Sequence, residues 1–293
     1  MKYKVKNLNQ DKKYIGVFDS GFGGLDILRG IIKIIPEYDY IYLGDTARAP
    51  YGNKSQEVIY RFTKEAVEFL FNNGCELIIL ACNTASSEAL ARLQKNVVIS
   101  YNKKHKTKKN VLGILVPTVE VSLLTTKVKY VGLLATKSTI NSKSFEREIK
   151  KLHNDVTILG VACPLLVPII EEGEEKNKII DLVLEKYLRE LKFKDKAKNL
   201  DTLILGCTHY GLIEKQIKKN IKKIFKSQKI EIVNESNLIG KKLKDYLERH
   251  LNIANQLSKN QDRIFFTTDN IEKFEEFGSR FFGQEILVKK INL

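Results

Sequence analysis

Short apolar runs alternate with longer amphipathic segments along almost the whole chain, and this alternation constrains the fold more than any other feature. The apolar runs predict these strands: Tyr14–Phe18, Tyr38–Leu43, Leu77–Ala81, Val111–Val116, Tyr130–Leu134, Val156–Val161, Thr202–Leu205 and Ile230–Val233. Between them apolar residues recur at helical spacing, as in Leu28, Ile31, Ile32 and Ile35. Strand–helix alternation is typical of mostly parallel sheets with helices on both faces, so we predict an α/β fold.

A weak internal repeat bears on the number of domains. The length of 293 residues favours two domains. The segment 77–84 resembles the segment 202–209, and each is an apolar strand followed by a cysteine, Cys82 or Cys207. A related strand precedes each of them, beginning near Ile15 and near Val131. Two half-chains that repeat one plan explain this pattern, and chance similarity of two buried strands also explains it.

The four cysteines give neither a disulfide framework nor a zinc ribbon, because they lie far apart without a CxxC pair. Cys82 and Cys207 follow predicted strands, where open α/β sheets bind their ligands. Cys82 also precedes a predicted helix, whose dipole is expected to lower the pKa of the thiol. The alternative is a buried structural thiol. Cys163 begins another apolar segment, whereas Cys75 precedes its predicted strand and is interpreted as structural.

Several polar segments follow other predicted strands. The glycine-rich turn 19–24 suits a carboxylate or phosphate, although it lacks the spacing of a nucleotide-binding loop. The loop 44–55 is either a binding loop or a surface connection. Thr136 and Thr139 are candidates for a ligand site or for a helix cap. Glu171 is either a catalytic auxiliary or part of a charged helix start.

The formal net charge of +15 invites a search for an acidic partner. The most basic run, residues 103–109, lacks interleaved aromatic residues, so we interpret it as a solvated loop and do not expect nucleic-acid binding. A nucleic-acid-binding protein stays as the alternative from another functional class. Residues 1–13 contain no apolar signal segment, and no run of about 18 apolar residues occurs, so we expect a cytoplasmic protein without a membrane span.

Five segments together resemble the signature segments of the glutamate racemase family, in that family's order. They are distributed over most of the chain: Ile15–Leu25, Gly44–Gly52, Ala81–Ser86, Cys163–Glu171 and Gly206–Tyr210. There are three departures. Phe22 stands where the family usually has a small aliphatic residue, Gly211 stands where proline is common, and residues 135–139 replace a Gly-Thr-x-Gly-Thr pattern.

The resemblance implies a two-base racemase that needs no cofactor and no metal, and that interconverts L- and D-glutamate to supply D-glutamate for peptidoglycan. It implies two pseudo-symmetric, doubly wound α/β domains with the active site in the cleft between them. One domain would comprise residues 1–115 and 236–293, and the other residues 116–235. The family also implies a homodimer. A racemase of the same superfamily that acts on aspartate is the alternative.

The resemblance also implies roles for individual residues. Cys82 would be the base that acts on D-glutamate, and Cys207 the base that acts on L-glutamate. Asp19 would assist Cys82, whereas His209, with Glu171 near it, would assist Cys207. The substrate's ammonium and carboxylate groups would be held by Ser20, Pro50, Tyr51, Gly52, Asn83, Thr84, Thr136, Thr139 and Thr208.

Overall fold

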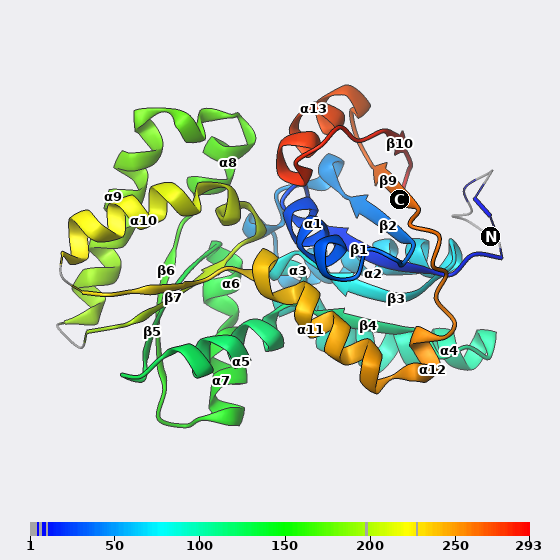
Figure 1. The fold of residues 1–293 in the computed structure, drawn as a ribbon, viewed down its shortest axis with the longest axis horizontal. Helices are drawn as coiled ribbons and strands as arrows, with labels where there is room; N and C mark the ends of the chain where they lie inside the picture. Colours follow the sequence, from blue (N-terminus) through cyan, green and yellow to red (C-terminus); the bar gives the residue numbers. More distant parts are fainter. Residues whose placement is uncertain (1–4, 6–7, 10, 197–198, 227) are drawn as a thin grey trace.

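A computed structural model describes residues 5, 8–9, 11–196, 199–226 and 228–293 and contains two parallel sheets (Figure 1). The expected first domain starts at residue 1, but residues 1–4, 6–7 and 10 lie outside the described part. The six-stranded sheet has the order β10-β9-β2-β1-β3-β4, and the four-stranded sheet has the order β6-β5-β7-β8. The strands are β1 (Tyr14–Asp19), β2 (Tyr40–Gly44), β3 (Cys75–Leu80), β4 (Asn110–Gly113), β5 (Tyr130–Ala135), β6 (Thr157–Ala162), β7 (Thr202–Gly206), β8 (Glu231–Val233), β9 (Arg263–Thr267) and β10 (Val288–Lys290).

The two sheets share one plan, which confirms the pseudo-symmetric, doubly wound α/β fold. The order β2-β1-β3-β4 in the first sheet matches β6-β5-β7-β8 in the second. In each half the first strand lies between the second and the third, so the chain winds first to one side and then to the other. The repeated segments found in the sequence are the equivalent strands β3 and β7. Their carboxyl ends lead to Cys82 and Cys207.

Both faces of the first sheet are buried, as parallel strands require. Along β1, Ile15 and Val17 belong to a core with α1 (Gly24–Ile34), α11 (Glu235–Arg249) and α13 (Ile271–Phe282). Tyr14 and Phe18 belong to a second core with α2 (Gln56–Asn72) and α3 (Asn83–Arg92). This alternation follows from the two-residue period of a strand. The first core continues into the second half of the molecule, where it includes Leu133 from β5.

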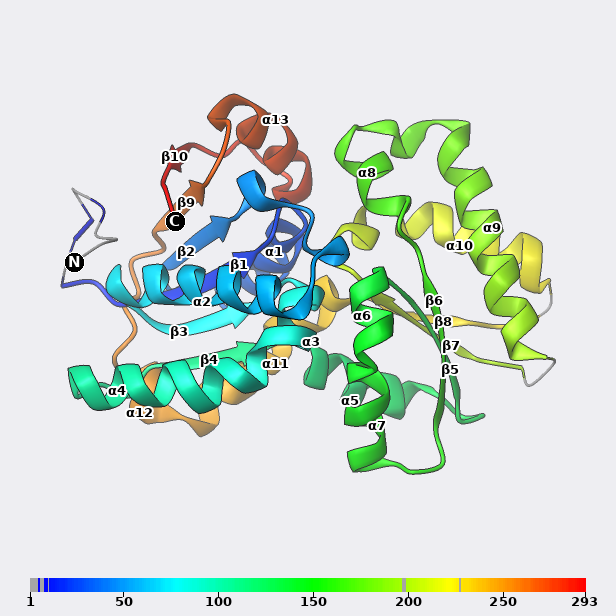
Figure 2. The ribbon, with the colours of Figure 1, turned by 180° about the vertical axis from the view of Figure 1, so that it is seen from behind.

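Helices cover both sheets. Figure 1 shows α9 and α10 on one face of the second sheet and α5 and α7 on the other, and Figure 2 shows α2 and α3 over the first sheet. In the described part of the chain, no helix is both long and apolar enough to cross a membrane. The helices are α1 (Gly24–Ile34), α2 (Gln56–Asn72), α3 (Asn83–Arg92), α4 (Ile99–His105), α5 (Leu115–Thr125), α6 (Lys137–Ser142), α7 (Ser144–Leu152), α8 (Leu166–Glu171), α9 (Lys178–Asp195), α10 (Glu214–Phe225), α11 (Glu235–Arg249), α12 (Leu251–Ala254) and α13 (Ile271–Phe282).

Some expected strand boundaries were wrong. The predicted strand Val111–Val116 ends at Gly113, because α5 already begins at Leu115. Cys75 is the first residue of β3 and does not precede it, although it still lies at the amino end, away from the edge where ligands bind. Strands β9 and β10, which extend the first sheet beside β2, were not predicted from the sequence.

The basic run 103–109 is not a solvated loop throughout. Residues 103–105 belong to α4, and Lys109 is buried. Its Nζ donates to the Cys75 carbonyl at 2.6 Å and lies 2.9 Å from Glu76 Oε1. A lysine that is paired and hydrogen-bonded tolerates burial, and the sequence pattern gave no sign of these partners.

Helices α1 and α11 pack very closely, which joins the C-terminal part of the chain to the first sheet. A Cβ at Gly30 would lie 1.9 Å from the Ser236 carbonyl oxygen, and a Cβ at Gly240 would lie 2.6 Å from the Gly30 carbonyl oxygen. The obstacles are backbone atoms, so a side chain at either position forces the helices apart.

Gly30→Ala is therefore expected to lower the free energy of unfolding by about 2 kcal/mol, as overpacked cores do. Urea denaturation followed by circular dichroism measures this change. Lys33→Ala on the exposed face of the same helix is the control and should change stability by less than about 0.5 kcal/mol. Equal stability of the Gly30→Ala variant and the unchanged protein would contradict the close-packing account.

Candidate active site

A cavity of about 50 Å³ lies between the two halves, at the carboxyl ends of their strands. This volume corresponds to a few water molecules, which is small for a ligand site. Asp19 and Thr139 do not line the cavity and lie buried behind its wall. The other candidate residues from the sequence all line it: Ser20, Pro50, Tyr51, Gly52, Cys82, Asn83, Thr84, Thr136, Glu171, Cys207, Thr208 and His209.

Cys82 lies between the end of β3 and the first turn of α3. Its backbone N–H is held by the Phe18 carbonyl at 3.4 Å, and its Sγ lies 3.4 Å from Ser20 Oγ. Burial, together with the nearby Asp19 carboxyl group, raises the pKa of Cys82 to about 12. The predicted lowering of this pKa by the helix dipole was therefore wrong. Removal of the thiolate from water destabilises it more than the amino end of α3 stabilises it.

Cys207 begins a chain of three interacting side chains. Its Sγ lies 3.8 Å from His209 Nδ1, and His209 Nε2 lies 2.9 Å from Glu171 Oε1. Burial alone would lower the pKa of His209, but its contacts with Cys207 and Glu171 outweigh burial and raise this pKa well above its usual value. These two contacts favour the protonated form of the imidazole beside the Cys207 sulfur.

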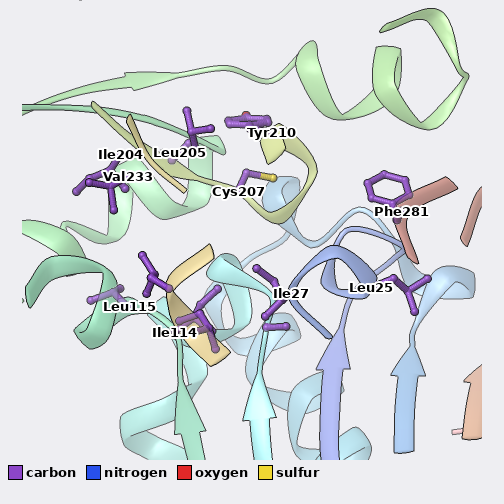
Figure 3. Close-up of a cluster of buried hydrophobic side chains, with 14 of the residues drawn as sticks. Leu25, Ile27, Ile114, Leu115, Ile204, Leu205, Cys207, Tyr210, Val233 and Phe281 are labelled. Carbon is purple, nitrogen blue, oxygen red and sulfur yellow. The ribbon is translucent and has the colours of Figure 1, made fainter. Parts of the chain in front are cut away.

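Cys207 belongs to a cluster of buried side chains that come from both halves. Figure 3 shows Leu205 and Tyr210 of its own half near it, and Ile27, Leu25 and Phe281 of the first half on the other side of the cluster. The Phe281 ring on α13 meets the His209 ring edge-on, with centroids 5.3 Å apart. Electrostatic interactions are strong in such a poorly hydrated site.

Asp19 connects the two halves beneath the cavity. Its Oδ2 accepts the Gly21 N–H at 2.9 Å, and its Oδ1 accepts the Thr208 hydroxyl at 3.3 Å. Burial raises the pKa of Asp19. The glycine-rich turn makes this contact possible, since a Cβ at Gly23 would lie 2.3 Å from Thr208 Oγ1. The glycine-rich turn 19–24 therefore packs against the loop after β7 and also faces the cavity.

The wall formed by Pro50, Tyr51 and Gly52 is anchored from behind by Asp45. The Tyr51 hydroxyl donates to Asp45 Oδ2 at 2.5 Å, and the Thr268 hydroxyl donates to Asp45 Oδ1 at 2.9 Å. Thr268 follows β9, so a strand missed by the sequence analysis helps to hold this wall. A carboxyl group buried below the loop gives the segment 50–52 a defined position.

Two threonines close the cavity on another side. Thr84 Oγ1 of the first half lies 3.1 Å from Thr136 Oγ1 of the second half. Thr136 also caps α6 by accepting the Thr139 backbone N–H at 3.3 Å, and its hydroxyl lies 3.1 Å from Thr139 Oγ1. Thr136 thus caps a helix and lines the cavity, so the two alternatives for this residue are not exclusive.

The cavity also contains residues that were not among the candidates: Ala49, Asn53, Lys137, Cys163, Pro164, Val167 and Pro168. Pro168 stands three residues before Glu171 on α8, and this helical spacing would have predicted a shared face. No comparable signal marks Phe281, because it reaches His209 only through the packing of α13.

The arrangement places two sulfur atoms from separate halves at one small cavity. Each has a polar neighbour, Ser20 for Cys82 and His209 for Cys207. Groups that exchange protons from two sides of a bound carbon atom can remove a hydrogen from one face and add one to the other. Such a site is suited to inverting a stereocentre.

Comparison with known proteins agrees with this reading of the site. Residues 15–233 match the family described as Asp/Glu/Hydantoin racemase. A glutamate racemase of Persephonella marina is 39% identical over 95% of this chain and 97% of its own length. One from Aquifex aeolicus is 35% identical over 93% and 95%, respectively.

Solved structures give the same result. A glutamate racemase isoform of Bacillus anthracis superimposes with a TM-score of 0.83 at 31% identity, over 96% of this chain and 98% of that chain. The glutamate racemase of Francisella tularensis, solved in complex with D-glutamate, gives a TM-score of 0.79 at 32% identity with the same coverage. The chain therefore belongs to the Asp/Glu/hydantoin racemases, and within them to the glutamate racemase family.

Proposed function

We propose that the protein interconverts L- and D-glutamate by a two-base mechanism in which Cys82 and Cys207 are the bases. The observation that carries the proposal is the position of the two thiols, which come from equivalent strand ends of the two halves and line one cavity. The named activity of its relatives and the D-glutamate complex of the Francisella tularensis enzyme support glutamate as the substrate.

In the direction from L- to D-glutamate, the Cys207 thiolate takes the α-proton and becomes a thiol. The electron pair left on Cα is delocalised into the α-carboxylate, and Cys82 then gives its proton to the opposite face of Cα. Cys82 ends as the thiolate and Cys207 as the thiol. The reverse reaction starts from that state. In each direction one proton leaves Cα and one proton is added to its opposite face.

The charges in the cavity support these starting states. The raised pKa of Cys82 keeps this residue protonated before L-glutamate is turned over. A protonated His209, 3.8 Å from Cys207 Sγ, stabilises an anion on that sulfur, and Glu171 holds the imidazole in place. Asp19 acts on the other side of the site, close to Cys82.

Polar groups of the cavity wall would hold the substrate. Hydroxyl and amide groups of Ser20, Asn83, Thr84 and Thr208 are suited to the ammonium and carboxylate groups of an amino acid. A cavity with little water also strengthens their interaction with charge that develops in the transition state. Pro50, Tyr51, Gly52 and Thr136 complete the wall, and Thr139 supports Thr136 from behind.

We extend the proposal to the organisation of the chain and its role. Residues 1–115 and 236–293 would form one domain and residues 116–235 the other; the close packing of α11 on α1 supports this division. Family resemblance supports a homodimer and a role in supplying D-glutamate for peptidoglycan. Sedimentation velocity would measure the oligomeric state.

The first test is incubation of the purified protein with L-glutamate in deuterated buffer, without added pyridoxal phosphate. Two-base catalysis predicts decay of the optical rotation, with solvent deuterium at Cα of the D-glutamate product. At early times the remaining L-glutamate should contain no deuterium, because its own base returns the hydrogen it removed. Chiral chromatography with mass spectrometry measures both pools.

Aspartate serves as the comparison substrate in the same assay. Faster turnover of aspartate than of glutamate would contradict the proposed substrate. Deuterium that entered both glutamate pools equally from the start would contradict separate bases on the two faces.

The second prediction concerns the cysteines. Cys82→Ser and Cys207→Ser should each lower kcat by at least about 10³-fold, because a serine hydroxyl is a far weaker acid than a thiol. Cys75→Ser is the control, because this buried cysteine lies at the opposite end of β3. It should keep racemase activity while losing about 1 to 2 kcal/mol of stability, since it buries a hydroxyl. Full activity of either cavity variant would refute its role as a base.

The third prediction concerns His209. His209→Asn should lower kcat/KM by about 10²-fold in both directions, since the two enantiomers have an equilibrium constant of one. The deuterium isotope effect should grow for α-deuterated L-glutamate, because proton removal by Cys207 becomes slower than the other steps. His153→Asn, which changes an exposed histidine on the second half, is the matched control. An unchanged isotope effect would argue against assistance of Cys207 by His209.

A further inference from the structure

A buried carboxyl group lies directly behind the cavity, and the proposed mechanism makes no use of it. Glu235, the first residue of α11, is 2% exposed. Its Oε2 accepts a hydrogen bond from Asn83 Nδ2 at 2.6 Å, and its Oε1 lies 3.1 Å from Thr118 Oγ1. Glu235 thereby joins α11 to α5 and to the residue that follows Cys82.

Asn83 has one end of its amide paired and the other end free. Its nitrogen is bound to Glu235, whereas its Oδ1 is buried without a hydrogen-bond partner among the described residues. Asn83 lines the cavity, so its unpaired Oδ1 is available to a hydrogen-bond donor of a ligand. A buried amide oxygen without a partner is costly, and such a group in a native structure calls for an explanation. In the amino acid proposed as substrate, the hydrogen-bond donor at neutral pH is the ammonium group.

We propose that Glu235 is a positioning residue: it holds the Asn83 amide with the nitrogen turned away from the substrate and the oxygen available to the substrate's ammonium group. This inference rests on the proposed function. A free asparagine amide can turn over and exchange its donor and acceptor ends. Turned over, it would present N–H groups where an acceptor is needed.

A neutral carboxyl group at Glu235 is compatible with its contacts. The Thr118 hydroxyl has one hydrogen and two acceptors within reach, the Ile114 carbonyl at 2.7 Å and Glu235 Oε1 at 3.1 Å. If that hydrogen is donated to the nearer Ile114 carbonyl, a neutral Glu235 can donate a proton on Oε1 to Thr118 Oγ1 while Oε2 accepts from Asn83. Burial, with a smaller contribution from Asp19, raises the pKa of Glu235 to about 8 against the opposing effect of its hydrogen bonds. A neutral group at this place also avoids repelling a dicarboxylate substrate.

A glutamine at this position reproduces the neutral arrangement, with its oxygen facing Asn83 and its nitrogen facing Thr118. Glu235→Gln should therefore keep KM for L-glutamate within about threefold of the unchanged protein. Glu235→Met has a similar size but no acceptor, so Asn83 loses its partner. KM should rise about tenfold, with kcat changed by less than about threefold, because a contact used for binding is lost. In an Asn83→Ala background, Glu235→Met should cause no further rise of KM.

Thr118 offers a milder test that does not depend on how well Glu235→Met folds. Thr118→Val removes the hydroxyl that holds Glu235 and should raise KM about threefold, whereas Thr118→Ser should not. Thr63→Val is the matched control. Thr63 is also buried and also donates to the carbonyl four residues earlier at 2.7 Å, but it lies on α2 and its hydroxyl is not paired with Glu235. Equal effects of Thr118→Val and Thr63→Val on KM would overturn the proposal.

Nuclear magnetic resonance separates this inference from the proposed function, because it needs no turnover. The side-chain amide signals of Asn83, assigned by their loss in Asn83→Ser, should exchange slowly with solvent. Glu235→Met should shift them and speed their exchange, whereas Glu235→Gln should preserve them. Signals unaffected by Glu235→Met would overturn the positioning role, even in an active enzyme. Protected signals in a protein that does not racemise glutamate would instead refute the proposed function.

Discussion

All strands of a parallel sheet end at the same edge, and this molecule sets two such edges against each other. Because β3 and β7 are equivalent strands of the two sheets, their carboxyl ends bring Cys82 and Cys207 to one cavity from opposite halves. Neither half contains a complete site. Under the proposed two-base mechanism, the need to reach one carbon atom from both faces gives a physical reason for building the enzyme from two repeats.

Buried polar groups around the cavity are stabilised by partners, and several of these partners come from the other half or from distant segments. Asp19 accepts the Thr208 hydroxyl across the interface. Asp45 holds Tyr51 with the help of Thr268, which is more than 200 residues away in the chain. Such pairs position the cavity wall before a substrate arrives, so little reorganisation remains for the transition state.

The sequence pattern was most reliable where period and local chemistry decide the outcome. The eight strands of the repeat and the polar turns after them could be predicted, since buried apolar runs and turn residues are local signals. The sequence pattern failed where long-range packing determines the structure. Residues 114 and 115 continue an apolar run but begin a helix against the second sheet, and Lys109 stands in a basic run but is buried beside Glu76. The sequence contained no local signal for the place of β9 and β10 beside β2.

The sequence by itself determined the repeated α/β plan and the identity of the two cysteines and their neighbours. The tertiary structure decided the pKa values of the side chains in the site. The dipole of α3 suggests an acidic thiol at Cys82, but burial beside Asp19 raises its pKa, and the pKa of His209 is raised by its contacts with Cys207 and with Glu171 on α8. Glu235 likewise reaches Asn83 only through tertiary packing, because α11 returns to the first sheet. Desolvation and the pairing of distant residues depend on the packed chain, whereas period and turn chemistry are already present in the sequence.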